Sequence, residues 1–345
     1  MNPLQKNIAT GTVVYAVEVE NLTKSFGAVK AIDRVSFAIN TGQIVGFLGP
    51  NGAGKSTTMR ILCGLLEATA GTARICGIPV SSRPTEIRRR IGYMPERNPL
   101  PEDLRVIEYL RYRARLKELP RKQIQSAVEE AMDLCDLNRK ASRRIIGTLS
   151  KGYLQRVGIA DAVLGNPDII IMDEPTIGLD PHQILGIRRL INNLRGKMTV
   201  LLSSHILPEI EMCCDSVIII NHGQIVAHGT SSDLRNEFLP QTRYRLNVRA
   251  EVEEIESILH STNEALSLVN SQTGADGYHE YSLEAASETE IAEYLITKLT
   301  ERGCTVREMA KIQPNLEDIF LAATRRSWDQ EHAVIGKLPP IKPNA

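Results

Sequence analysis

The spacing of hydrophobic residues changes along the chain and divides it into regions. From about Val17 to Thr230, short β-branched runs alternate with helix-length stretches, a pattern typical of an α/β domain with a largely parallel sheet. Between about Asn98 and Asp161 the strand pattern disappears, and apolar residues recur at helical spacing. The pattern therefore predicts a helical subdomain within the α/β domain.

Shorter strands and helices return after Pro240. The segments RYRLNVRA, LSLVN, HEYSLEA and CTVREM predict strands, and SETEIAEYLITKLTE and NLEDIFLAAT predict helices. In the last helix, Leu316, Ile319 and Ala323 recur at helical spacing after Asn315, a candidate cap. This region is predicted to be a small α+β domain.

These patterns predict the domain boundaries. We expect a flexible N-terminal extension over residues 1–15, the α/β domain over 16–240 with its helical subdomain over about 97–161, the small α+β accessory domain over 241–325, and a flexible tail over 326–345. The tail is rich in proline near its end and has no periodicity.

The charge balance and the length of the apolar segments limit which kinds of partner the sequence predicts. Lys plus Arg equals Asp plus Glu at 41 each, so a broad basic face for nucleic acid is not expected. The longest apolar runs, such as Ile169–Met172 and Val217–Ile220, are far shorter than the about 20 residues of a spanning helix. The N-terminus also lacks the pattern of a signal peptide. Any link to a membrane is therefore expected through a partner.

The six cysteines are scattered, without a CxxC pair or zinc-ligand spacing. We interpret them as reduced thiols of a cytosolic protein.

A glycine-rich motif between a predicted buried strand, QIVGFLG, and a predicted helix, TTMRILCGLL, is the strongest chemical signal. Glycines let several backbone N–H groups turn towards a phosphate, and the positive end of the following helix adds to them. Lys55 would bridge the β- and γ-phosphates, and Ser56 would hold Mg²⁺. An ordinary glycine-rich turn is the alternative, which the strand–turn–helix context disfavours. The motif and its first helical residues are Gly49, Pro50, Asn51, Gly52, Ala53, Gly54, Lys55, Ser56 and Thr57.

Two carboxylates follow the hydrophobic run Ile169–Met172. At the end of this strand, Asp173 is expected to reach the shell of Mg²⁺ through water, and Glu174 to polarise the attacking water. The alternative is a strand that ends in solvated acids.

The glycine-rich motif fits the P-loop pattern, and three further motifs follow this P-loop in a fixed order. Thr148–Arg156 resembles the signature motif of ABC ATPases, Gly178–Pro181 resembles their D-loop, and His205 matches their switch histidine. With the P-loop, these motifs resemble the ATP-binding subunits of ABC transporters, and most closely the exporter branch whose ATPase subunits are separate chains. The resemblance implies an α/β P-loop ABC ATPase core with a β-rich edge and a helical subdomain, followed by the small α+β domain.

The resemblance also implies roles for individual residues. ATP would lie between the P-loop of one subunit and the signature of another, with Glu174 as general base and with His205 and Lys55 stabilising the transferred charge. Ordinary structural roles remain as alternatives: a generic loop for the signature residues, a histidine satisfied at a strand end, and a core phenylalanine for Phe26. The residues expected at the nucleotide in addition to the P-loop are Phe26, stacked on adenine, and Ser150, Lys151, Gly152 and Asp180.

Departures from the common family pattern concern the signature and the metal site. In the signature, Lys151 and Tyr153 stand where most family members have other residues, a form that the resembled subfamily often has. Glu96 stands where most members have the glutamine that reaches Mg²⁺ and water. The expected metal ligands are therefore Ser56, Glu96 and Asp173.

The function that follows is ATP hydrolysis by a transporter subunit with ATP and Mg²⁺ as cofactors. Its expected partners are a second copy of itself or a homologous ATPase subunit, and separate transmembrane permease subunits, through which it lies at the cytoplasmic face of the cell membrane. One alternative is a soluble ABC ATPase acting on ribosomes or DNA, although the chain has one cassette and no sustained heptads. A non-catalytic regulatory module is another, against which Glu174 and His205 argue. Export is favoured, and import remains open.

Overall fold

The computed structural model describes residues 15–137, 139–239, 241–260, 266–274, 276–285 and 292–335. The chain divides into two compact units, Met1–Thr230 and Ser231–Ala345. Most of the expected N-terminal extension (1–15) and the end of the expected tail lie outside the described residues.

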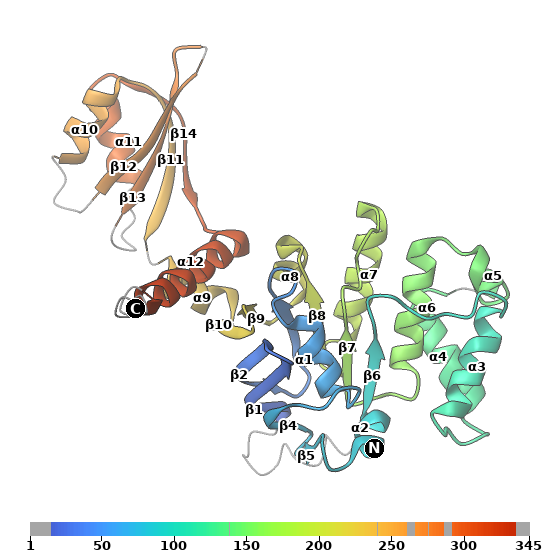
Figure 1. Cartoon of the computed structure of the whole chain (residues 1–345). Coiled ribbons are helices and arrows are strands. Elements are labelled where there is room, and N and C mark those ends of the chain that lie inside the picture. The colour runs from blue at the N-terminus through green and yellow to red at the C-terminus, as the bar shows by residue number, and fades with distance from the viewer. Residues whose placement is uncertain are drawn as a thin grey trace, which may run out of the picture. The chain divides into compact units, whose positions relative to one another are not determined.

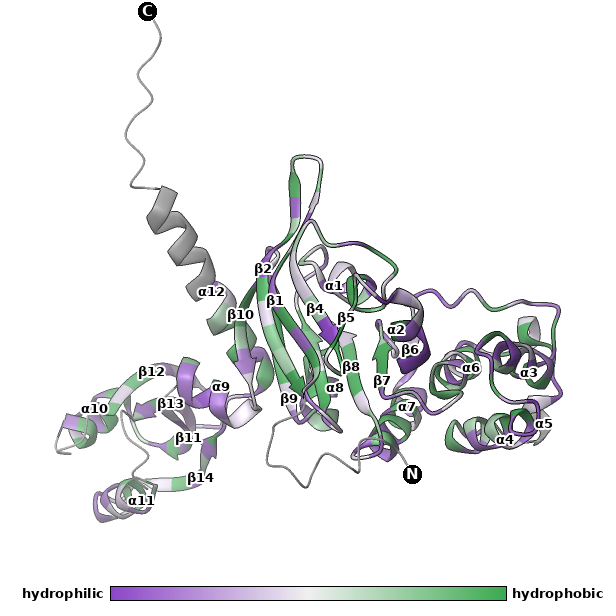
Figure 2. Cartoon of the chain, turned by 90° about the horizontal axis from the view of Figure 1, so that it is seen from below, coloured by the Kyte–Doolittle hydropathy of each residue, from purple (hydrophilic) through white to green (hydrophobic). Residues whose placement is uncertain are grey.

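The first unit is built on a largely parallel sheet of short, buried strands (Figure 1). β10 alone among these paired strands runs antiparallel to its neighbour. Figure 2 shows hydrophobic residues in green along β7, β8 and β9, which is expected for strands buried on both faces. In spatial order the strands are β10 (Gln224–Gly229), β9 (Ser216–Asn221), β3 (Ile44–Leu48), β8 (Thr199–Ser204), β7 (Ile169–Met172) and β6 (Ile91–Met94).

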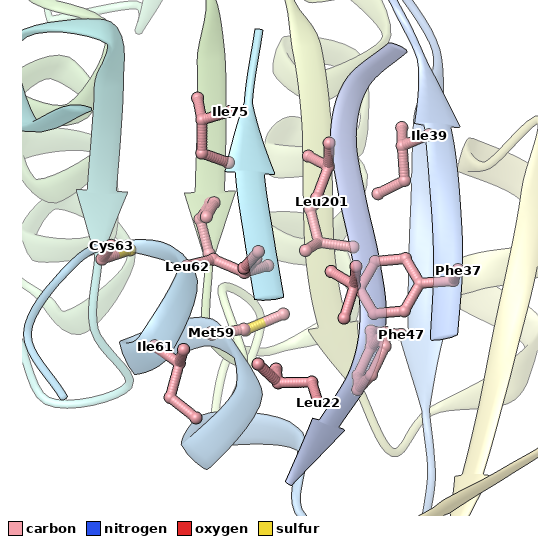
Figure 3. Packing of buried hydrophobic residues seen from close by; sticks show 14 of the residues in the cluster. Leu22, Phe37, Ile39, Phe47, Met59, Ile61, Leu62, Cys63, Ile75 and Leu201 are labelled. Carbon is pink, nitrogen blue, oxygen red and sulfur yellow. The ribbon is translucent and has the colours of Figure 1, made fainter. Parts of the chain in front are cut away.

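An antiparallel sheet packs beside it and forms the β-rich edge. The side chains of its inner face meet those of α1 and of the parallel sheet in one apolar core, in which the ring centroids of Phe37 and Phe47 lie 5.7 Å apart (Figure 3). This core fixes the start of α1 relative to the strand that precedes it. The strands are β2 (Val29–Asn40), β1 (Tyr15–Phe26), β4 (Ala70–Ile75) and β5 (Ile78–Pro79).

The helices of the first unit form two groups. Those that connect strands of the core are α1 (Lys55–Leu62), α2 (Pro84–Arg90), α7 (Pro181–Leu194) and α8 (Leu207–Cys213). Those of the helical subdomain are α3 (Val106–Leu116), α4 (Ile124–Leu134), α5 (Arg139–Ser142), a short 3₁₀ helix (Ile146–Thr148) and α6 (Lys151–Val163). The predicted fold class, an α/β core with a helical subdomain, is confirmed.

The second unit begins with α9 (Ser231–Phe238) and ends with α12 (Leu316–Ile335). Between them the order strand–helix–strand–strand–helix–strand gives a sheet in the order β12–β13–β11–β14, the split β-α-β topology of ferredoxin-like domains. The predicted small α+β domain is confirmed as part of the fold. Its remaining elements are β11 (Thr242–Arg249), α10 (Val252–His260), β12 (Leu266–Thr273), β13 (His279–Ala285), α11 (Ala292–Glu301) and β14 (Thr305–Ile312).

The side chain of Asn315 caps α12 as expected. The amide N–H of Asp318 donates to Asn315 Oδ1 and the amide N–H of Asn315 donates to Asp318 Oδ2, each over 3.0 Å. Helix α12 continues to Ile335, so its last ten residues, 326–335, fall within the segment expected to be a tail. The helix α10 was not predicted.

None of the helices formed by the described residues is sufficiently long and apolar to span a membrane.

Candidate functional site

The glycine-rich motif connects β3 to α1, as its flanking patterns predict. Gly54 has φ +106°, and a Cβ there would lie 2.6 Å from the Ala31 carbonyl oxygen, so both conformation and space require glycine. In the described structure no side chain caps α1 and its first turn holds no acid. Its N–H groups and the positive end of its dipole therefore remain available to an anion.

Lys55 begins α1 and is buried. Its ammonium donates hydrogen bonds to the carbonyl oxygens of Gly49 and Pro50, at 2.7 and 3.2 Å. Burial lowers the pKa of Lys55, and nearby carboxylates oppose that shift. These carboxylates belong to Glu174, Asp173 and Glu96. The Lys55 ammonium is thus hydrogen-bonded to its own loop, close enough to the three carboxylates for their charges to act on it.

The two acids after β7 are both buried, with 3% of Asp173 and 6% of Glu174 exposed. The hydroxyl of Ser203 on β8 donates to Asp173 Oδ1 at 2.6 Å and accepts the Glu174 amide N–H at 2.9 Å. Glu174 has φ +50°, which is uncommon for a residue with a side chain. Ser203 was not predicted as a site residue, although its position two residues before His205 was a usable signal.

His205 lies just beyond β8, beside Glu174. Its Nδ1 is 2.7 Å from Glu174 Oε2. A carboxylate can only accept hydrogen bonds, so Nδ1 carries the proton of this contact when Glu174 is ionised. One oxygen of Glu174 is then engaged, and the other is available as an acceptor.

A cleft of about 430 Å³ brings these residues together. The sequence predicted most of its lining, but not Ala31 or Ile177. The predicted residues that line it are Asn51, Gly52, Gly54, Lys55, Ser56, Thr57, Glu96, Glu174 and His205.

The other predicted residues do not line this cleft. Phe26 is 52% exposed at the end of β1, with the Lys24 ammonium 5.1 Å from its ring centroid, so it is not a core phenylalanine. Asp173 is buried and does not line the cleft. Gly49, Pro50 and Ala53 belong to the loop that forms its wall. A separate group at the starts of α6 and α7 contains Ser150, Lys151, Gly152 and Asp180.

The signature and the predicted D-loop lie side by side. A Cβ on Gly152 would approach Gln183 Oε1 to 2.6 Å, and one on Gly178 would meet the Lys151 ammonium. Ser150 precedes α6 with an exposed side chain that caps no backbone N–H in the described structure. Asp180 accepts the amide N–H of Gln183 at 2.9 Å and so caps α7. The start of α6 is therefore a second exposed helix N-terminus, outside the cleft.

A buried hydrogen bond connects the turn after Glu174 to the helix after His205. The Thr176 hydroxyl donates to Glu209 Oε2 at 2.6 Å, and both side chains are buried. The turn and α8 are thereby held together, which fixes the loop that carries His205.

The cleft combines a phosphate-binding loop, a cation and an acid–imidazole pair, which suits hydrolysis of a nucleoside triphosphate.

Comparison with known proteins supports this chemistry. Residues 32–177 match the family described as ABC transporter. Nod factor export ATP-binding protein I of Sinorhizobium fredii (strain NBRC 101917 / NGR234) is 33% identical over 315 residues, which are 90% of this chain and 86% of the relative. Linearmycin resistance ATP-binding protein LnrL of Bacillus subtilis (strain 168) is 29% identical over 312 residues, 90% of this chain and 99% of the relative.

A solved structure gives the same result for the fold and the reaction. A dimeric ATP-binding cassette in a post-hydrolysis state, bound to ADP and phosphate, superposes with a TM-score of 0.57 and 27% identity, over 62% of this chain and 98% of that one. The resemblance found in the sequence is confirmed. The chain therefore belongs to the ABC transporter family as an ATP-binding subunit, and the reaction that it catalyses is the hydrolysis of ATP.

Proposed function

We propose that two copies of this chain close head to tail around ATP, so that the P-loop of one copy faces Ser150 of the other. The observation that carries this proposal is the separation of two helix N-termini without a side-chain cap within one chain. The start of α1 opens into the cleft, whereas the start of α6, at exposed Ser150, does not. Each would contribute to a γ-phosphate only if two chains share the site. The dimeric form of the solved relative supports the same arrangement.

Within this shared site, Glu174 acts as general base. Its engagement with His205 leaves one carboxylate oxygen to accept a proton from the attacking water. His205 holds Glu174 in place, and Lys55 exchanges its bonds to the loop carbonyls for bonds to phosphate. Lys151, Gly152 and Asp180 belong to the surface that the partner's nucleotide would meet, and Phe26, exposed on the hairpin, offers its face to adenine.

The residues near the cleft fit Mg²⁺. The donors are the Ser56 hydroxyl and the carboxylates of Asp173 and Glu96, and oxygen is the ligand that Mg²⁺ prefers. Among the described residues no three His, Cys, Asp or Glu side chains form a metal-binding group. Such a sparse protein shell suits an ion that takes most ligands from phosphate and water. When bound, Mg²⁺ would neutralise charge on the phosphates.

The transmembrane partners of such a subunit would dock in a groove of about 1020 Å³ between α2 and the helical subdomain. Leu65 and Leu116, which line it, are 50% and 54% exposed, and Arg88 adds positive charge at its rim. Docking there would hold this subunit at the cytoplasmic face of the membrane. Export is the proposed direction, because relatives matched over most of their length are named for export or resistance. An action on ribosomes or DNA is not favoured for the same reason.

Cysteine cross-linking tests the head-to-tail dimer. In a version of the chain without its native thiols, Asn51→Cys and Ser150→Cys are introduced on separate chains, which are then mixed. Asn51 is chosen because it lines the cleft and avoids the positive φ of Gly52. We expect a disulfide between chains only with ATP and Mg²⁺. A cross-link that ignores nucleotide, or none at all with nucleotide, would refute the arrangement.

A further inference from the structure

Ser203 lies at the centre of the proposed catalytic group but outside the cleft. Its side chain is fully buried on β8, between the two acids that end the neighbouring strand. We propose that Ser203 is a positioning residue for ATP hydrolysis, whose hydroxyl fixes the Asp173 carboxylate and the backbone of Glu174 together. The inference rests on the roles proposed above for Asp173 and Glu174.

The two hydrogen bonds of Ser203 show in which direction its hydroxyl proton points. The Asp173 carboxylate can only accept, so the Ser203 hydroxyl donates its proton to Oδ1 across 2.6 Å. A lone pair of the same oxygen then accepts the Glu174 amide N–H across 2.9 Å. One hydroxyl thus serves as donor to the first acid and as acceptor from the second.

The bond to Asp173 limits how its carboxylate can rotate. The amide N–H of Asp173 donates to the Met94 carbonyl oxygen at 2.9 Å, which fixes the backbone. With Oδ1 held by Ser203, the direction of Oδ2 is set as well. A charge-assisted bond of this kind is about twice as strong as one between neutral groups. Ser203 therefore orients a carboxylate that would act on the metal.

The bond to Glu174 supports an unfavourable backbone conformation. With φ +50°, Glu174 occupies the left-handed region, which is unfavourable for a residue with a side chain. The amide N–H of Glu174 is satisfied by Ser203, and its side chain by His205. Without Ser203 this buried amide would lose its partner, and the turn could relax to a conformation that moves the base.

The strand makes Ser203 and His205 act on the same acid. Ser203 lies on β8 and His205 follows just after the strand ends, and both contact Glu174. Ser204 between them has a different partner, since its oxygen accepts the amide N–H of Ile206 at 3.0 Å. Glu174 is thereby held at its backbone by Ser203 and at its side chain by His205.

Three substitutions separate hydrogen bonding from packing. Ser203→Ala removes the hydroxyl, Ser203→Cys keeps the approximate size with a weak donor, and Ser203→Thr keeps the hydroxyl. We expect Ser203→Ala and Ser203→Cys to lower kcat by about 10- to 100-fold, as is usual for groups that orient a metal site. Ser203→Thr should retain most of the wild-type kcat. The affinity for ATP without metal, measured by calorimetry, should stay unchanged, because Ser203 does not line the cleft.

A matched control lies at the other end of the same strand. The Thr199 hydroxyl is also buried and accepts a backbone N–H, that of Gly42, at 3.0 Å. Thr199→Val should lower the Tm about as much as Ser203→Ala does, with wild-type kcat.

Glu174→Gln, measured beside these variants, separates the two proposals. If Glu174→Gln is inactive while Ser203→Ala keeps the wild-type kcat, the positioning role is wrong. Wild-type activity in Ser203→Cys would show that size alone matters and would also overturn it. Turnover by Glu174→Gln would instead refute the general base.

Discussion

The Nδ1 atom of His205 lies 2.7 Å from Oε2 of Glu174, although the two residues are 31 positions apart in the chain. Parallel pairing of β7 with β8 brings the carboxyl ends of both strands to the same edge of the sheet. The acid and the imidazole therefore form one unit at the wall of the cleft, which Lys55 also lines.

Removing the base alone should trap the enzyme with ATP. In Glu174→Gln the amide oxygen can still accept the proton of His205 Nδ1, so the geometry is kept, but the group no longer accepts a proton from water. We expect no steady-state phosphate release, unchanged ATP binding, and a dimer in ATP and Mg²⁺ by sizing chromatography. A variant that remains monomeric with ATP would contradict the prediction.

Two inactive variants should restore each other if the site is shared. Lys55→Ala removes the buried cation of the P-loop and should weaken ATP binding at least tenfold, since bonds to charged groups contribute about 1.5–3 kcal/mol. Ser150→Arg should leave ATP binding by one chain intact and block closure, because Ser150 is exposed outside the cleft. Mixed chains can form one site with both defects and one with neither.

We therefore expect ATPase activity in the mixture that neither variant has alone. Each variant mixed with itself is the control. Absence of recovery in heterodimers that are shown to form by pull-down would argue against a shared site.

The hydrogen bond between Thr176 and Glu209 should contribute to stability through its burial. Thr176→Val keeps the shape and leaves the Glu209 carboxylate without this donor, which should lower the free energy of unfolding by about 1–3 kcal/mol. Thr176→Ser keeps the donor and should cost less. Denaturant unfolding of both variants measures the difference. Equal losses would mean that packing, not the hydroxyl, stabilises this turn.

Lys117 should make stability depend on pH. Its side chain is half-buried against the end of α6, where the ammonium donates to the Leu164 carbonyl oxygen at 3.0 Å, and this burial lowers its pKa to about 8 from 10.5. Between these values the folded chain has lost a proton that the unfolded chain still holds, so stability rises with pH through this window. Below pH 8 Lys117 is protonated in both the folded and the unfolded chain, and burial of its charge then destabilises the folded chain fully.

Lys117→Met should remove this dependence. Relative to that variant, the unfolding free energy of the wild type should increase by about 1–3 kcal/mol between pH 8 and 10.5. Lys122→Met, at an exposed lysine before α4, is the control and should retain the increase. A constant difference between wild type and Lys117→Met across the window would refute the assignment.

The sequence by itself determined the parts of the site that are contiguous. The P-loop could be predicted because its function depends on consecutive backbone groups between one strand and one helix, from Gly49 to Thr57. The acids after Ile169–Met172 and His205 after its buried strand could be predicted because each strand's length fixes where its end falls. The spacing of hydrophobic residues predicted the α/β class, the helical subdomain and the strands of the second unit.

Only the tertiary structure decided which separate residues meet. Ser203 reaches both acids because β8 pairs with β7 in one register, and a shift of one residue would turn its side chain to the other face. The bond from Thr176 to Glu209, the contact of Ala31 with the cleft, and the positive φ of Glu174 likewise depend on chain segments far apart in sequence. Local propensity does not encode such pairs, because they form only when strand register and helix packing bring distant segments together.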